Sequence, residues 1–166
     1  MKNASEFLGT YVRYNLWANE QVAGLLSQLS EGDLDREMQS SFPTIRKTAF
    51  HIWDAEHIWL TRLKGTSLTD WPSKTIPANT PAERFTTASK EFLDFVSGKD
   101  EDYFLQKTEF KTMNGDPFSQ LNSQMIMHCM NHSTFHRGQL ITMMRATGRN
   151  ENFPRTDMII FFRDEL

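Results

Sequence analysis

The sequence predicts an all-α protein built as a four-helix bundle. Four long segments, residues 5–29, 44–64, 80–98 and 120–147, repeat apolar side chains every three to four positions, which is the period of an amphipathic helix. Helices of this length bury their apolar stripes against one another in a bundle. At 166 residues the chain is most simply one domain that spans residues 1–166.

Capping and breaking residues delimit the first two helices. Ser5 is the expected N-cap of the first helix, which should run to Leu29. The second helix follows Pro43 and stops before Gly65, in agreement with the preference for proline ahead of a helix and glycine after it. Its apolar face contains Ile45, Ile52, Trp59 and Leu63.

The third and fourth helices carry similar signals. Thr80 and Pro81 form an N-cap followed by a first-turn proline, and Glu83 completes a capping-box pattern. This helix should end at Gly98, and the fourth should end at Gly148.

The connections between the helices differ in kind. Residues 65–79 contain two prolines and, when extended, reach about 50 Å, so this long crossover can span the bundle between the second and third helices. Residues 104–110 and the Asn114-Gly115 pair indicate a small hairpin before the fourth helix. The apolar tail, residues 157–163, should pack as a short C-terminal helix.

Composition restricts the function. The net charge is only −3 and no long basic run occurs, which argues against a nucleic-acid partner. No stretch approaches the ~18 apolar residues of a membrane span and no apolar signal core opens the chain, so we expect a cytoplasmic protein without a membrane partner. Cys129 is the single cysteine, so an internal disulfide is excluded and a metal site needs histidines and carboxylates.

Three of the 5 histidines lie on one stripe of the fourth helix. His128, His132 and His136 follow one another at four-residue steps, each rotated about 40° from the last. Two imidazoles one turn apart can hold one metal ion. His128 and His136 are about 12 Å apart along the axis, so all three cannot share it. The spacing leaves the pairs His128/His132 and His132/His136 both open.

The second helix offers His51 or His57 as a further ligand. A helical wheel puts His51 on the more apolar flank, which modestly favours it for a cleft wall. Asp54 lies one turn from His51 and would either orient its imidazole or be solvated. Glu56 falls about 140° round the helix from His51, so no general base is identified and the catalytic residues stay unknown.

The chain resembles the DinB/YfiT family of small four-helix-bundle metalloproteins along nearly its whole length. Residues 14–19 resemble the aromatic–Asn–Trp-Ala-Asn signature of the family's first helix. Residues 51–59 resemble its His-x-x-Asp-Ala-Glu-x-x-Trp segment. Residues 128–139 resemble its His-x-x-Asn-His-x-x-x-His-Arg-Gly-Gln segment, and residues 154–157 its Pro-x-Thr-Asp ending.

The resemblance implies that His51, His132 and His136 hold one divalent metal ion, with Zn²⁺ and Ni²⁺ as the first candidates. It also implies an up-down-down-up bundle and a homodimer. His128 then either supports a ligand, lines the pocket wall or is an ordinary core histidine, and the sequence does not separate these roles. Asn131, Arg137 and Gln139 either line the cavity or brace the bundle, and the sequence does not separate these roles. The list of candidate ligands is thus His51, His132 and His136.

Three imidazoles leave coordination positions open, as in catalytic metal sites, because structural zinc is usually closed by four protein ligands. Characterised relatives include thiol S-transferases and a thiol-dependent isomerase. The resemblance therefore implies a metal-dependent enzyme that acts on a small molecule, of thiol S-transferase or hydrolase type, with a low-molecular-weight thiol as a candidate substrate. The alternative is a non-catalytic bundle that binds metal or a small ligand and acts in stress response through dimer contacts.

Overall fold

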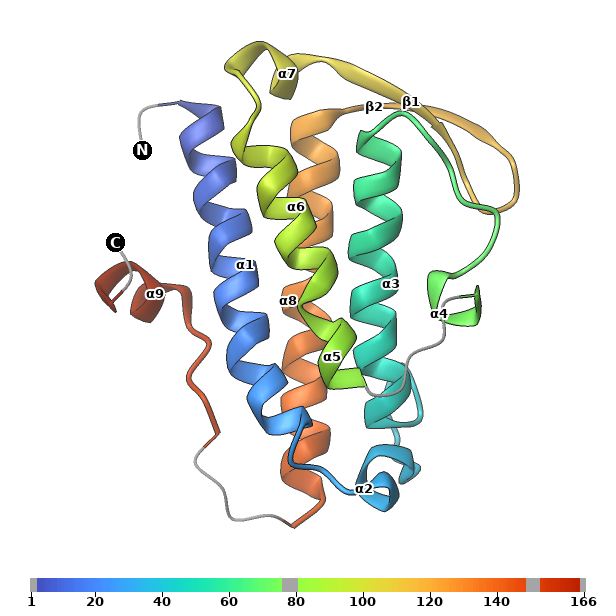
Figure 1. Cartoon of the computed structure of the whole chain (residues 1–166), viewed down its shortest axis with the longest axis vertical. Coiled ribbons are helices and arrows are strands. Elements are labelled where there is room, and N and C mark those ends of the chain that lie inside the picture. Colours follow the sequence, from blue (N-terminus) through green and yellow to red (C-terminus); the bar gives the residue numbers. More distant parts are fainter. Residues whose placement is uncertain (1–2, 76–80, 149–152, 165–166) are drawn as a thin grey trace.

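The structure, a computed structural model, describes residues 3–75, 81–148 and 153–164. It is mostly helical with one small sheet, so the expected helical class is confirmed (Figure 1). Four rods lie side by side along the long axis of the molecule. They are α1 (Ala4–Leu26), α3 (Ile45–Leu63), α5 (Pro81–Phe85) continued by α6 (Thr87–Ser97), and α8 (Asn122–Ala146).

The bounds of α1 differ from those predicted. Its N-cap is Asn3 instead of Ser5, because the Asn3 side chain accepts a hydrogen bond from the backbone N–H of Glu6 at 2.9 Å. The helix ends at Leu26, before the predicted Leu29.

Helices α3 and α8 end where glycine was expected to end them. Gly65 follows α3 with φ 77°, and Gly148 follows α8 with φ 86°. Both lie in the left-handed region that glycine adopts without a steric cost. Thr44, the first residue of the predicted segment, is the N-cap of α3 and accepts from the backbone N–H of Lys47. The predicted start of α8 at Gln120 is wrong, because that residue belongs to the preceding strand.

The third predicted helix is divided into two. It begins at Pro81 as expected, and Thr86 interrupts it between α5 and α6. Gly98 closes α6. The predicted cap Thr80 lies outside the described residues.

Three short helices lie in the connections between the rods and were not predicted: α2 (Glu31–Asp35), α4 (Pro72–Thr75) and α7 (Glu101–Leu105). The last corrects the hairpin prediction, since Phe104 and Leu105 belong to a helix. Asp100 caps this helix by accepting from the N–H of Tyr103, and Phe104 is fully buried in the core.

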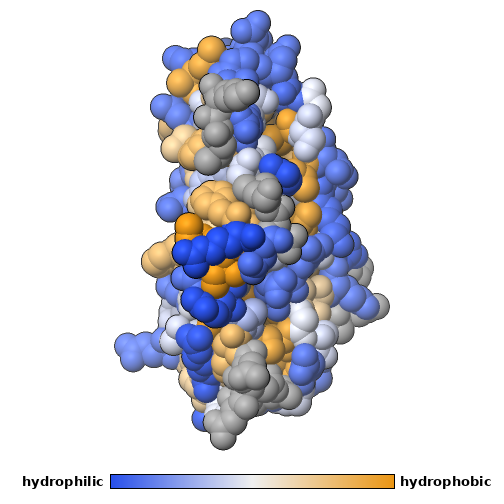
Figure 2. Space-filling model, turned by 90° about the vertical axis from the view of Figure 1, so that its left-hand side faces the viewer, coloured by the Kyte–Doolittle hydropathy of each residue, from blue (hydrophilic) through white to orange (hydrophobic). Residues whose placement is uncertain are grey.

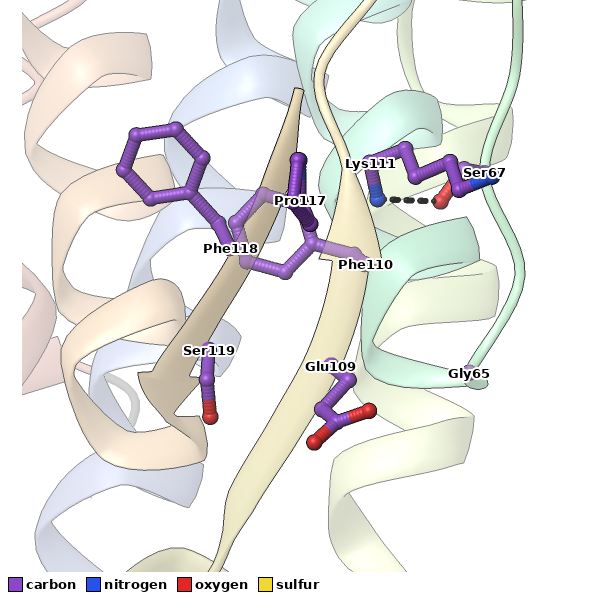
Figure 3. A pocket seen from close by; sticks show the side chains of 8 residues that line it. All are labelled: Gly65, Ser67, Glu109, Phe110, Lys111, Pro117, Phe118 and Ser119. Atoms are coloured by element: carbon purple, nitrogen blue, oxygen red, sulfur yellow. Dashed lines mark hydrogen bonds between the residues drawn. The ribbon is translucent and has the colours of Figure 1, made fainter. Parts of the chain in front are cut away.

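The remaining hairpin pairs β1 (Lys107–Lys111) with β2 (Pro117–Leu121), antiparallel, with Phe110 opposite Phe118. Gly115 lies in the connecting turn with φ 90°. The backbone N–H of Lys111 donates to the Ser67 hydroxyl at 2.8 Å, the bond drawn in Figure 3. The hairpin is thereby fixed to the chain that leaves α3.

The two larger apolar clusters of the core are separated by a polar layer. One cluster contains Val22, Leu25, Ile45, Ile52, Phe85 and Leu140, and the other contains Leu8, Val12, Leu60, Phe92, Met125 and Met130. Each of the four rods carries at least one buried polar residue between the two clusters in sequence. These residues are Asn15, Asn19, Glu56, Ser89, Ser133 and Arg137.

The C-terminal segment forms α9 (Met158–Asp164), so the expected short helix is confirmed. It lies against α1, with the Phe161 ring centroid 5.8 Å from that of Tyr14 and 5.7 Å from that of Trp17. Figure 2 shows this side of the molecule, where hydrophobic and hydrophilic residues are intermixed over the surface. None of the helices in the described ranges is long and apolar enough to cross a bilayer.

Candidate metal centre

His51, His132 and His136 meet where α3 packs against α8. One ring nitrogen of each lies within 4.8 Å of those of the other two. The Nε2 atoms of His51 and His132 are 3.0 Å apart. Of the two pairs that helical spacing left open on α8, the structure brings His132 and His136 to His51. No carboxylate or cysteine belongs to this cluster in the part of the chain that the structure describes.

Burial keeps these imidazoles neutral. Loss of solvation, with a smaller repulsion from His136, lowers the pKa of His51 to about 4. The same two causes, with added repulsion from His51 and His128, lower the pKa of His132 to about 3. Burial also lowers the pKa of His136, against a raising effect of its hydrogen bond to Gln139. Neutral imidazole is the form that binds metal ions.

Gln139 sets the tautomer of His136. Its side-chain oxygen lies 2.8 Å from Nδ1 of His136, and its amide nitrogen donates to the Ser41 hydroxyl at 2.8 Å. The amide oxygen can only accept, so the imidazole proton is on Nδ1 and the Nε2 lone pair is available. A hydrogen bond of this kind to the far nitrogen is typical of metal-binding histidines.

One ring nitrogen of the cluster has no hydrogen-bond partner. Nδ1 of His132 is buried, and no acceptor or donor contacts it among the described residues. Leaving a buried polar atom unpaired costs on the order of 1–3 kcal/mol. The convergence of the three rings is a separate observation, and three imidazole nitrogens suit Zn²⁺, Ni²⁺, Cu²⁺ or Fe²⁺. The residues present therefore fit a divalent transition metal.

Aromatic rings cover the solvent side of His51. The Phe42 ring centroid lies 4.1 Å from that of His51 and 5.7 Å from that of His136, and the Trp71 ring lies 5.6 Å from His51. His51, Phe42 and Trp71 line a cavity of about 410 Å³, which also reaches Asp54. The cluster is thus bordered by a cavity large enough for a small molecule.

Asp54 has neither of the roles considered for it. It is buried, and its carboxylate accepts from the backbone N–H of Ser73 at 2.7 Å and from the Ser73 hydroxyl at 2.5 Å. Asp54 therefore fixes the segment that contains α4 to α3, and this contact brings Trp71 close to His51.

His128 lies outside the cluster, one turn along α8. Its side chain is exposed, its ring centroid is 6.1 Å from that of His132, and it packs 4.8 Å from the Trp59 ring. It lines a different cavity from His51, as expected for a pocket-wall residue. Asn131 is also exposed.

A buried polar network beside the histidines was not predicted. The carboxylate of Glu56 faces away from them, as the helical wheel indicated, and accepts four hydrogen bonds in the core. The donors are Asn15 at 2.7 Å, Asn19 at 3.0 Å, Ser133 at 2.8 Å and Ser89. These donors belong to α1, α6 and α8, so Glu56 connects its own helix to the other three rods.

Arg137 occupies the other side of the same network. Its guanidinium is 1% exposed and donates to the side-chain oxygens of Asn15 and Asn19, both at 2.9 Å. Each asparagine thus connects Glu56 to Arg137. Because Arg137 follows His136 directly and Ser133 follows His132, the network holds the part of α8 that presents the histidines. Arg137 therefore braces the bundle, while Gln139 orients His136 in the histidine cluster.

The DinB family model matches residues 1–160 of the chain. The DinB protein of Bacillus subtilis (strain 168) is 25% identical over 153 residues, which cover 87% of this chain and 88% of that protein. Among solved structures, a DinB-like protein from Bacillus cereus ATCC 10987 is similar with a TM-score of 0.60 and 22% identity, covering 86% of this chain and 91% of the other. This last similarity concerns the fold alone.

Proposed function

The chain belongs to the DinB family, and from this premise we propose that it is a three-histidine metalloprotein that works as a metal-dependent enzyme on a small molecule. In this proposal His51, His132 and His136 hold one divalent ion, with Zn²⁺ and Ni²⁺ as the leading candidates. The observation that carries the proposal is the convergence of three imidazoles within 4.8 Å, with no carboxylate or cysteine joining them among the described residues.

An ion held by three imidazoles keeps coordination positions open and supplies Lewis acidity, which lowers the pKa of a bound water or thiol. The protein's own residues prepare the site. Gln139 holds the His136 proton on Nδ1, and Phe42 and Trp71 pack against His51 and border the cavity beside it.

The single cysteine of the chain is not available as a nucleophile. Cys129 is fully buried, and burial together with Glu56 raises the pKa of its thiol well above the usual value, so it cannot attack a substrate. This supports a reaction in which water or a low-molecular-weight thiol attacks, that is, a hydrolase or thiol S-transferase type.

The proposal extends to the architecture. We infer the up-down-down-up order of a four-helix bundle, which Figure 1 supports because α1 and α8 descend in that view while α3 and α6 ascend. A homodimer remains part of the proposal. Large exposed apolar side chains, such as Phe7, Phe118 and Phe135, offer surface for such a contact.

The catalytic proposal is tested by turnover. Protein loaded with Zn²⁺ or Ni²⁺ is assayed with thiols and a chromogenic electrophile, and separately with amide and ester substrates. We expect turnover that disappears in the His132→Ala variant and is retained in the His57→Ala variant. Stoichiometric metal without turnover across this panel would instead favour the non-catalytic, dimer-based stress-response function.

A further inference from the structure

A second cavity, of about 520 Å³, lies between α3, α8 and the hairpin. Arg62 and Trp59 of α3 line it, together with Gln124 and His128 of α8 and the rings of Phe110 and Phe118. His128 belongs to this cavity and lies one turn from His132, with ring centroids 6.1 Å apart, so one wall of the cavity is a helical turn from the three-histidine cluster. Among the described residues, no carboxylate lines the cavity.

Arg62 lines this cavity and has no anionic partner in the part of the chain that the structure describes. Its guanidinium carbon lies 4.7 Å from the Trp59 ring centroid and 4.9 Å from the Phe110 ring centroid, so aromatic rings pack against it. Its Nε is buried without an acceptor, and no described residue forms an ion pair with it. Arginine stays charged in proteins and presents a planar fork of donors suited to carboxylate or phosphate.

The hairpin holds this arrangement in place. Figure 3 shows Phe110 and Phe118 on neighbouring strands, and their rings stack with centroids 6.1 Å apart. The hydrogen bond from Lys111 to Ser67 fixes β1, the strand that carries Phe110, to the segment after α3. The hydroxyl of Thr108 also donates to the side chain of Asn122, at the start of α8, at 2.6 Å. Arg62 is therefore positioned before any ligand arrives, which reduces the entropy cost of binding.

We propose that this cavity binds the anionic group of a small molecule through the guanidinium of Arg62, with the surrounding rings packing against the apolar part of the molecule. Arg62 lies eleven residues after His51 on α3, about 16 Å along the helix axis. This step rests on the proposed function, in which the reaction takes place at the histidine cluster. The separation then assigns the substrate class: an elongated molecule with a carboxylate or phosphate at one end and its reacting group at the other.

The test measures anion binding in metal-free protein by calorimetry, with 2-naphthoate as the probe and 2-naphthamide as its uncharged analogue. We expect naphthoate to bind at least about tenfold more tightly than the amide, and Arg62→Met to remove that difference, because a charge-assisted hydrogen bond contributes about that much. The Arg62→Lys variant should retain part of the difference in affinity between naphthoate and the amide. Inorganic phosphate should compete with naphthoate, which shows whether the site also accepts free phosphate.

Arg145→Met is the matched control, since Arg145 also stacks on an aromatic ring, 5.0 Å from the centroid of Phe153, but near the far end of α8. The affinity of the Arg145→Met variant for naphthoate should equal that of the wild type. No naphthoate binding, equal affinity for the two probes, or unchanged affinity in a folded Arg62 variant overturns the proposal. If neither variant folds, the comparison of the two probes on wild-type protein decides. Because metal is absent throughout, failure of this site and failure of the metal centre are separate results.

Discussion

The side-chain oxygen of Gln139 accepts a hydrogen bond from Nδ1 of His136 across 2.8 Å, within one turn of α8. The amide of Gln139 is held in turn by the Ser41 hydroxyl. This chain of two bonds connects the loop before α3 to a ring of the histidine cluster. It also leaves the Nε2 lone pair of His136 available for a cation.

Replacing Gln139 by leucine should weaken metal binding while retaining the three ligands. Loss of such an orienting partner typically reduces metal affinity about tenfold to a hundredfold. A competition titration with a chromogenic chelator measures the effect. Thr142→Val is the control, because Thr142 is exposed on the same helix and its hydroxyl bonds only to the carbonyl of Gly138. Equal affinities for Gln139→Leu and wild type would exclude the orienting role.

The metal-free protein should lose stability as the pH is lowered from about 6.5 towards 4. The pKa values of His51 and His132 are about 4 and about 3 in the folded state, below the ~6.5 of an unfolded imidazole. Between these values the unfolded chain binds more protons than the folded protein does. The free energy of unfolding therefore decreases as the pH is lowered. Well above pH 6.5 the imidazoles of His51 and His132 are neutral in both the folded and the unfolded chain, so their contribution to stability is constant.

Thermal unfolding of metal-free protein between pH 7.5 and 4.5 measures this dependence. His51→Asn removes one of the titrating rings, so the variant's midpoint should fall less steeply than that of the wild type. Parallel curves for the two proteins would show that His51 does not carry the predicted shift.

Arg137→Met should destabilise the fold strongly. The substitution removes the charged donor shared by Asn15 and Asn19, the two residues that also donate to the buried Glu56 carboxylate. Removing one partner from a buried charged network costs about 3–5 kcal/mol. Urea unfolding measures the loss. Lys90→Ala, which breaks an exposed pair with Glu20 at 3.6 Å, should cost no more than about 1 kcal/mol. Similar losses for both variants would contradict a stabilising role of the network.

Cys129 should resist alkylation in the folded protein. Its side chain is fully buried, and burial raises the pKa of the thiol. Iodoacetamide at pH 8 should therefore modify it only at the rate of unfolding, and urea should release rapid modification. Rapid labelling without urea would mean that a protein thiol is accessible, which would remove one reason for an external nucleophile.

Local signals predicted most of the helical framework. Thr44, Gly65 and Gly148 act within a few residues of themselves, so the ends of α3 and α8 follow from sequence. The predictions were wrong where another capping residue lies close in the sequence. Asn3 caps α1 in place of Ser5, and Asp100 draws Phe104 into a helix instead of a strand.

The histidine cluster was predictable in part. Helical spacing places His132 beside both His128 and His136, but it cannot tell which level of α8 lies opposite His51, because that depends on how the helices are shifted along one another. The resemblance to the family supplied that choice. The network of Glu56 and Arg137 was missed, since its members come from four separate rods and only the three-dimensional structure brings them together.

Metal analysis of protein purified without an affinity tag tests the central claim most directly. We predict one divalent ion per chain in the wild type, its loss in His132→Ala, and its retention in His128→Ala, whose ring lies outside the cluster. A His132→Ala variant that is folded and still binds one ion per chain would contradict the three-histidine centre.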